Sequence, residues 1–125
     1  MRIGELAKRT KLTRDTIRFY EKHELIASKA SEEASNDYRD YPEDLVERLE
    51  MIIAARDAGM SIADLKTLVL HMETGPSEDF AVETFMDAKI LDLRRTIANA
   101  RKFLRLLEAT KSALASGPVE WRKDR

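Results

Sequence analysis

The feature that most constrains this 125-residue chain is a regular apolar pattern in its last third. From Met86 to Leu107, apolar residues recur at alternating steps of four and three, and Lys111 interrupts the pattern before Leu114. This spacing is the a/d heptad of a coiled coil, held for about four repeats, on a helix predicted over residues 80–116. The predicted dimerisation seam consists of Met86, Ile90, Leu93, Ile97, Ala100, Leu104, Leu107 and Leu114.

A helix of this length extends for roughly 50 Å, and its apolar seam must be covered. The rest of the chain forms a domain too small to cover all of it, so the pattern favours a homodimer in which two such helices pair. The alternative is a single helix that folds back across its own domain. The spacing leaves open whether paired helices run parallel or antiparallel.

Charge is unevenly distributed along the chain, although the net charge is only −1. Residues 1–22 carry seven Lys/Arg and three Asp/Glu, and residues 101–125 carry the same numbers. Residues 23–100 hold eight basic and seventeen acidic residues. A basic end on a near-neutral chain predicts an anionic partner such as a phosphate backbone; the alternative is an ordinary solvated helix.

The residue types exclude several classes of function. The chain has no cysteine, which excludes disulfides, zinc fingers and thiolate catalysis. It has no Gly-rich phosphate loop and no H-E-x-x-H motif, and His23 and His71 are isolated. We therefore expect no enzyme activity, no catalytic residues, no metal site and no cofactor. No apolar run approaches the roughly 20 residues of a membrane span, so we expect a cytoplasmic protein without membrane contact.

The basic N-terminal region predicts two short helices joined by a tight turn. Residues 3–10 place apolar side chains on one face, and Lys11 follows at the break. Thr13 is the expected N-cap of the second helix, because its hydroxyl can accept a hydrogen bond from the amide of Thr16. The second helix is expected to end near Lys22. Two short helices with this connection form a helix-turn-helix pattern.

The second helix divides into a core side and a basic side. At about 100° per residue, Ile17 and Tyr20 fall on the core side, and Phe19 lies at the margin. Arginines on the basic side can bridge guanine or clamp phosphate. The acid on that side either accepts from a cytosine amino group or steers the neighbouring arginines. The basic side consists of Arg14, Asp15, Arg18 and Lys22.

Further elements follow the helix pair. Residues 27–40 lack a helical period and predict a β-hairpin with its turn at 36–37. Pro42 is expected to begin a third helix, and Ser61 is expected to cap a fourth. The predicted divisions are a DNA-binding domain over 1–72, a linker over 73–79, the dimerisation helix over 80–116 and a tail over 117–125.

Three stretches carry a family pattern. They read I-G-E-L-A-K-R-T-x-L-T-x-x-T-I-R-F-Y-E-x-x-x-L, then Y-R-D-Y, then L-x-x-I-x-x-A-R-x-A-G-M-S-I-x-x-L. Over about residues 2–70, the chain resembles the MerR family of bacterial transcriptional regulators. The resemblance implies a mainly α fold, in which a winged helix-turn-helix domain with a β-hairpin wing precedes a long helix in an antiparallel coiled coil.

The resemblance also implies a function. Members bind a pseudo-palindromic operator in an over-long promoter spacer as homodimers, and they distort this double-stranded DNA so that RNA polymerase can use the promoter. Transferred by position, the resemblance places DNA contacts on the second helix, the wing and the turn between the third and fourth helices. With the basic side of the second helix included, the predicted DNA-binding residues are Arg14, Asp15, Arg18, Phe19, Tyr20, Lys22, Tyr38, Arg39, Arg56 and Ser61.

The chain departs from the family at three turns. Many members have glycine where this chain has Lys11, Glu24 and Asp37. All three residues are expected at positive φ, at a cost of order 1 kcal/mol each. The wing lacks the usual proline pair, and thiol-based metal sensing is excluded because there is no cysteine.

An effector of unidentified chemistry would have to use the ends of the coil or the tail. Trp121 and either Phe80 or Phe85 are candidate pocket walls; the favoured alternative for Trp121 is docking on the partner helix. Two other functions stay open from the sequence. One is an architectural or excisionase-like DNA-binding protein without promoter control, and the other is a helical protein-interaction adaptor.

Overall fold

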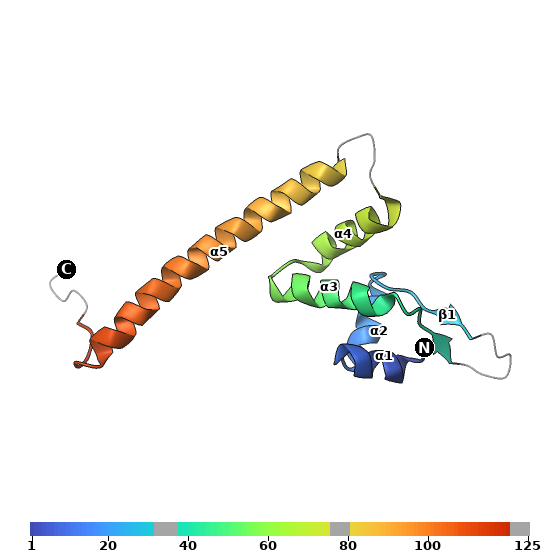
Figure 1. The fold of residues 1–125 in the computed structure, drawn as a ribbon, viewed down its shortest axis with the longest axis horizontal. Coiled ribbons are helices and arrows are strands. Elements are labelled where there is room, and N and C mark those ends of the chain that lie inside the picture. Colours follow the sequence, from blue (N-terminus) through green and yellow to red (C-terminus); the bar gives the residue numbers. More distant parts are fainter. Residues whose placement is uncertain (32–37, 76–80, 121–125) are drawn as a thin grey trace. The chain divides into compact units, whose positions relative to one another are not determined.

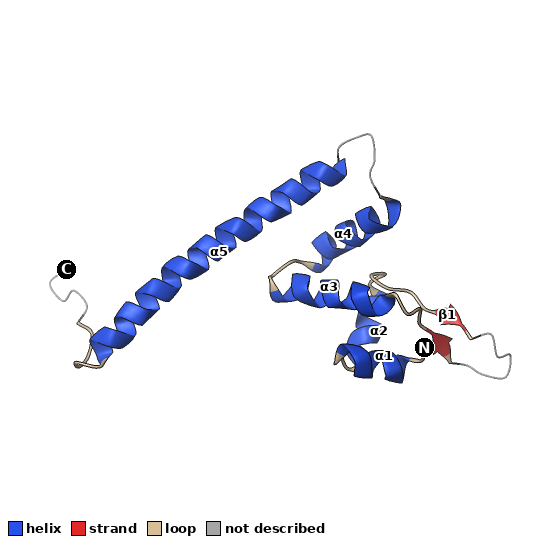
Figure 2. Cartoon of the chain, viewed as in Figure 1, coloured by secondary structure: helices blue, strands red, loops and turns tan. Residues whose placement is uncertain are grey.

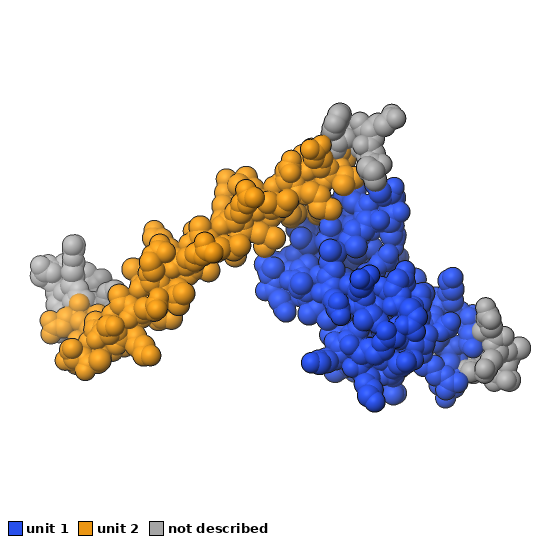
Figure 3. Space-filling view, in the orientation of Figure 1, with its two compact units in different colours: residues 1–76 blue, residues 77–125 orange. Residues whose placement is uncertain are grey.

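The computed structural model describes residues 1–31, 38–75 and 81–120. These residues form five helices and one two-stranded antiparallel hairpin (Figures 1 and 2). The predicted fold class is confirmed, since a helix-turn-helix, a small β wing and a long C-terminal helix are all present. The chain divides into two compact units, Met1–Pro76 and Ser77–Arg125, which Figure 3 distinguishes by colour.

The first two helices form where the sequence predicts them. Helix α1 spans Ile3–Thr10 and α2 spans Arg14–Lys22. The Thr13 hydroxyl accepts a hydrogen bond from the amide of Thr16 at 3.1 Å, which confirms the predicted N-cap. Between the helices, Lys11 adopts the predicted left-handed conformation, with φ 60°. This residue redirects the chain within a single turn, and α1 then packs against α2.

A second left-handed residue ends α2. Glu24 has φ 63°, and the amide of Leu25 donates to the carbonyl of Tyr20 at 3.0 Å. This closure is the Schellman motif, which is usually built on glycine. It turns Leu25 into the core, where its side chain is fully buried. Positive φ is thus confirmed at both predicted positions that the structure describes.

The wing is a short antiparallel pair. Strand β1 spans Lys29–Ala30 and β2 spans Arg39–Asp40, with Lys29 opposite Asp40. The amide of Ser31 donates to the carbonyl of Tyr38 at 3.3 Å, which extends the pairing beyond the strands. These contacts confirm the predicted hairpin in the described part of residues 27–40.

Helix α3 spans Leu45–Asp57 and therefore begins later than predicted. Pro42 does not open the helix; it lies in the turn before it, where its carbonyl accepts from the amide of Leu45 at 3.2 Å. The preceding residue, Tyr41, is only 3% exposed, and its amide donates to the carbonyl of Met1 at 2.7 Å. The chain is thus held in the core immediately before the proline, and it needs a turn before it can start the helix.

The connection from α3 to α4 follows the predicted capping signals. Gly59 has φ 91°, and the amide of Met60 donates to the carbonyl of Ala55 at 2.9 Å. Helix α4 spans Ile62–Thr74, and the Ser61 hydroxyl caps it by accepting from the third residue of the helix at 3.0 Å. A Schellman end followed directly by an N-cap therefore makes the connection between α3 and α4.

The core of the first unit lies among α1 to α4. Helix α3 packs against α1 and against α4. The apolar face of α4 is only partly buried: Leu65 has no exposed surface, whereas Met72 near the end of the helix is 43% exposed. No buried polar or charged residue is found in the described part of the chain. The fully buried large side chains are Leu6, Ile17, Leu25, Leu49, Ile52 and Leu65.

Helix α5 spans Ala81–Leu114, with 34 residues and a length of roughly 50 Å. None of its residues is buried. In the predicted seam, Met86 is half-buried and the other members are exposed in the single chain, for example Ile97 at 49% and Leu104 at 55%. None of the helices in the described ranges has the combination of length and apolar character that crossing a membrane requires.

Some predictions concern residues outside the described ranges. They are the wing turn at Asn36 and Asp37, the positive φ of Asp37, and the proposed roles of Phe80 and Trp121.

Candidate DNA-binding surface

The two sides of α2 have opposite environments. Ile17 is fully buried and fixes the rotation of the helix against the core. Arg14, Asp15, Arg18 and Lys22 are all exposed. The predicted division into a core side and a basic side is therefore what the structure shows. Three cations on one exposed side of a short helix can meet a polyanion without any rearrangement of the core.

Arg18 and Asp15 form an ion pair along this exposed side. The Arg18 Nη1 lies 3.4 Å from the Asp15 Oδ1, and the two side chains are 60% and 96% exposed. Such an exposed pair contributes little to stability. It does restrict where the guanidinium points, which favours the view that Asp15 steers its neighbouring arginine.

The aromatic residues of α2 divide between surface and core. Phe19 is 44% exposed, and its ring centroid lies 4.4 Å from that of His23 and 5.7 Å from that of Tyr20. Tyr20, which is also among the predicted DNA contacts, is only 7% exposed and belongs to the core cluster. It lies beside Ile17 on the helix, so its ring serves packing.

Glu21 joins α2 to the base of the wing. Its Oε2 accepts from the hydroxyl of Ser28 and from the Ser28 amide at 3.2 Å, and its Oε1 accepts from the Tyr41 hydroxyl at 2.8 Å. Arg39 completes the joint, since its Nε donates to the Ser28 Oγ and its Nη2 to the Ser28 carbonyl, both at 2.9 Å. These four residues form one connected joint between helix and hairpin.

The carboxyl group of Glu21 is ionised in this joint. Burial raises the pKa of Glu21, but hydrogen bonds from Ser28 and Tyr41 and the charge of Arg39 outweigh it, so the pKa lies below its ordinary value. Burial and the hydrogen bond to Glu21 raise the pKa of Tyr41. The joint therefore contains an ionised carboxylate and a neutral phenol across the neutral pH range.

The remaining predicted contacts lie on the wing and at the α3–α4 turn. Tyr38 is 58% exposed, and Arg39 is exposed although it is bonded to Ser28. Arg56 is exposed and donates to the carbonyl of Met60 at 3.1 Å, close to the exposed cap residue Ser61. The structure thus brings Arg56 and Ser61 together at one turn, as the sequence predicts.

Sequence reasoning missed Glu21, Ser28 and Arg2. Glu21 had a usable signal: it falls at about 40° from Ile17 on the helical wheel, so a carboxylate lies on the apolar side and needs donors. Ser28 and Arg2 had none, because their partners are distant in sequence. The guanidinium of Arg2 lies over the Tyr38 ring, 4.3 Å from its centroid. In the described ranges, no group of three or more His, Asp or Glu side chains is placed to hold a metal ion.

Comparison with known families gives two matches. The profile described as "MerR HTH family regulatory protein" matches residues 1–71, and the profile described as "MerR, DNA binding" matches residues 46–110. The first match covers α1, α2, the wing, α3 and most of α4. The second covers α3, α4 and most of α5.

Individual proteins agree with the family matches. The chain is 31% identical over 114 residues to the HTH-type transcriptional regulator ZntR of Escherichia coli (strain K12), which covers 90% of this chain and 79% of that protein. It is 29% identical over 106 residues to the mercuric resistance operon regulatory protein of Bacillus cereus, covering 85% of this chain and 79% of the relative.

Solved structures show the same fold. HiNmlR, described as a MerR family regulator lacking the sensor domain and bound to promoter DNA, aligns with a TM-score of 0.73 at 18% identity over 93% of both chains. The transcription regulator PbrR691 of Ralstonia metallidurans CH34, in complex with lead(II), aligns with a TM-score of 0.61 at 28% identity, over 98% of this chain and 91% of that one. The chain belongs to the MerR family and is a transcriptional regulator with a helix-turn-helix DNA-binding domain.

Proposed function

We propose that this regulator binds a pseudo-palindromic promoter operator as a homodimer and acts by distorting the spacer DNA. Residues 1–72 serve as the DNA-binding domain and residues 80–116 as the dimerisation helix, joined by a linker over 73–79 and followed by a tail over 117–125. RNA polymerase is the partner that uses the distorted promoter. The proposal assigns the chain no catalytic activity.

The observation that carries the DNA-binding part is the two-sided character of α2. Ile17 is fully buried on one side, while Arg14, Arg18 and Lys22 are exposed on the other. The Glu21 joint attaches the wing to the same helix. We assign α2 to the major groove, which admits a helix, and the wing residues Tyr38 and Arg39 to the adjoining backbone.

The dimer rests on the exposed seam of α5. Leu93, Ile97 and Leu104 recur at heptad spacing and are 37%, 49% and 55% exposed. A monomer would leave this apolar stripe in water, whereas a second copy of the helix would bury it. The antiparallel direction of the pair, and an effector of unidentified chemistry at the coil ends or tail, belong to the proposal through family resemblance alone.

Distortion of the spacer belongs to the proposal through family resemblance. A protein that reads few bases can still discriminate among promoters if it deforms the DNA, because the deformation energy depends on sequence. The proposed contacts outside α2, at Arg56 and Ser61, would hold phosphates while the spacer bends.

Replacing Arg18 by Ala tests the direct contact. We expect operator binding to weaken by about 1–3 kcal/mol, with relaxed preference at one base position, if the guanidinium reads a base. Gel-shift titration measures the affinity. The matched control is Arg105→Ala, which removes one exposed charge from α5. Equal affinity of the Arg18 variant and the wild-type protein would reject this assignment.

Transcription with purified RNA polymerase tests promoter control. We expect the regulator to change transcript yield from a promoter with an over-long spacer, and to lose this effect when the spacer is shortened to ordinary length. A protein that binds the operator but leaves both yields unchanged is an architectural or excisionase-like protein. A protein that fails to bind its own upstream DNA at low salt is an interaction adaptor.

A further inference from the structure

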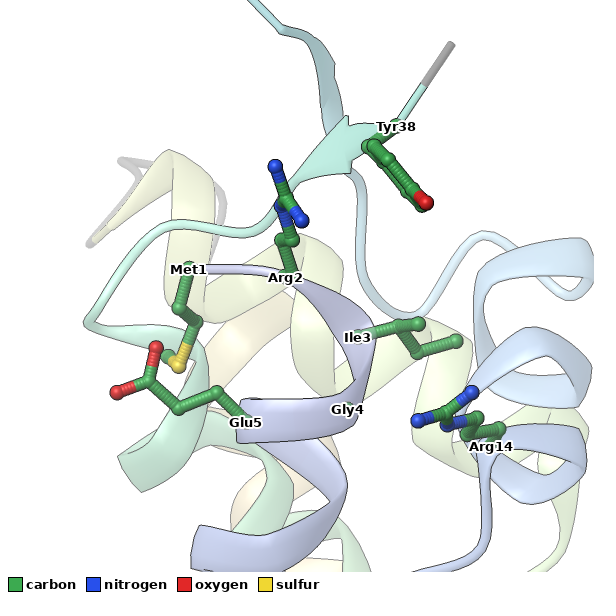
Figure 4. A pocket seen from close by; sticks show the side chains of 7 residues that line it. All are labelled: Met1, Arg2, Ile3, Gly4, Glu5, Arg14 and Tyr38. Carbon is green, nitrogen blue, oxygen red and sulfur yellow. The ribbon is translucent and has the colours of Figure 1, made fainter. Parts of the chain in front are cut away.

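A hollow of about 680 Å³ lies between the first turn of α1 and the wing (Figure 4). Two predicted DNA contacts line it: Arg14 enters from α2 and Tyr38 from the edge of β2. Arg2, which the sequence analysis did not select, lines it as well. Residues from three separate segments therefore meet at one exposed opening.

Arg2 is held at this opening by an aromatic ring. Its guanidinium lies 4.3 Å from the centroid of Tyr38, within the range of a cation–π contact. Figure 4 shows the Arg2 side chain, from the residue before α1, beside the Tyr38 side chain of the wing. The contact positions the charge without using any of its five N–H donors, so these donors can serve an anion.

At the opposite wall, Arg14 lies close to Gly4, and the lack of a side chain at Gly4 leaves room for the guanidinium. A Cβ built at Gly4 would lie only 2.8 Å from the Arg14 Nη2 and 3.6 Å from its Cζ. Any residue other than glycine would therefore displace the guanidinium. Gly4 has no positive φ that would require glycine. The lack of a side chain at Gly4 leaves space for the arginine at this point of the helix.

The charges around the hollow favour an anion. Among the described residues that line the hollow, Arg2 and Arg14 contribute two cations and Glu5 contributes one acid. Figure 4 shows the Glu5 carboxylate on the Met1 side, turned away from Arg14 and Tyr38. The Met1 amine is already paired with Asp40 at 2.7 Å. A tyrosine hydroxyl and two guanidinium groups are donors typical of phosphate contacts on DNA.

We propose that this hollow is a phosphate-binding site for the DNA backbone, in which Arg2 on Tyr38 and Arg14 against Gly4 hold a phosphate beside α2. Gly4 is then a positioning residue that sets the direction of Arg14. The inference rests on the proposed DNA-binding function and extends it to a strand segment between the α2 contacts and the wing contacts.

Arg2→Ala tests the site, with Lys8→Ala as the matched control because Lys8 is an exposed cation on α1 outside the hollow. The probe is a duplex selected from random-sequence DNA by the wild-type protein. We expect Arg2→Ala to weaken binding about tenfold for each copy. The slope of log K against log salt should fall by about 0.9 for each lost phosphate contact. Base preference should stay unchanged, and Lys8→Ala should leave the slope as it is.

A double-mutant cycle tests the role of Gly4. We expect Gly4→Ala to lower affinity as much as Arg14→Ala does, and the double variant to lose no more than either single one. Thermal stability of Gly4→Ala should not fall, because alanine favours a helix more than glycine does. Additive losses, or a loss explained by a lower Tm, would show that Gly4 acts on the fold alone.

The outcomes separate this site from the function on which it rests. A wild-type protein that selects no duplex removes both. A wild-type protein that binds DNA while Arg2→Ala and Lys8→Ala behave alike keeps the proposed function and rejects the phosphate site.

Discussion

The two units of this protein reach stability in opposite ways. The first unit encloses a core in which Leu6, Leu49 and Leu65 have no exposed surface, whereas α5 has no buried residue along its 34 positions. The helices of both units follow an apolar periodicity. In the first unit the apolar side chains are buried within the unit, whereas those of α5 are not. An apolar period therefore predicts a helix in both units, but it does not predict whether that helix is buried within its own unit.

The comparison is most strongly tested at the seam of α5. We expect Leu104→Glu to convert the dimer to monomers and to unfold α5, because a carboxylate would be buried in the apolar interface. Sedimentation measures the mass, and circular dichroism measures the helix content. Leu91→Glu is the control, since Leu91 is 49% exposed and lies outside the heptad seam. A dimer that survives Leu104→Glu and dissociates with Leu91→Glu would refute the register.

The core of the first unit provides the converse test. We expect Leu49→Ala to lower the free energy of unfolding of this unit by about 2–5 kcal/mol, because it leaves a cavity in a fully buried position. DNA binding should weaken with it, while sedimentation still reports a dimer held by α5. Urea denaturation gives the free energy. Loss of both DNA binding and dimerisation would mean that the two units do not fold separately.

A smaller effect concerns the joint between α2 and the wing. The pKa of Glu21 is lowered in the folded state, so its stabilising contribution is full above the ordinary pKa of 4.5 and is lost as the pH falls through the lower folded pKa. We expect the first unit to lose stability below about pH 4.5, and Glu21→Gln to reduce this loss at a cost of about 1 kcal/mol at pH 7. Urea denaturation at several pH values measures both the loss of stability in acid and the cost of the substitution at pH 7. Unchanged acid sensitivity in Glu21→Gln would exclude the carboxylate as its source.

The smallest effect separates strain from helix propensity. We expect Lys11→Gly to raise the free energy of unfolding by about 0.5–1 kcal/mol, because it relieves a left-handed conformation with φ 60°. Lys102→Gly in the middle of α5 should instead destabilise the helix by about 1 kcal/mol. Thermal unfolding of the two variants gives the signs. Destabilisation by both would show that the Lys11 side chain contributes more than its backbone strain costs.

Local rules accounted for much of the fold and part of the candidate site. The Thr13 and Ser61 caps, the left-handed Lys11 and Glu24, and the exposed face of α2 each depend on residues within one or two turns. Such short-range patterns are visible in sequence. The core position of Tyr20 was visible on the same wheel, although family resemblance placed it among the DNA contacts.

What escaped prediction depends on partners far apart in the chain. Tyr41 bonds to Glu21 across twenty positions, and its backbone amide bonds to Met1. These contacts delay the start of α3, which the proline signal alone placed too early. The Arg2–Tyr38 contact has the same character. Only the folded arrangement of α1, α2 and the wing brings these groups together.

The lack of buried residues in α5 has a consequence for how long the protein survives. A chain diluted below the dissociation constant of its dimer would present an unprotected helix to proteases, while a paired chain would not. Chains made above this dissociation constant would persist as dimers, and chains made below it would be degraded. Turnover would therefore set a threshold for the regulator, and its working pool would consist almost entirely of paired chains.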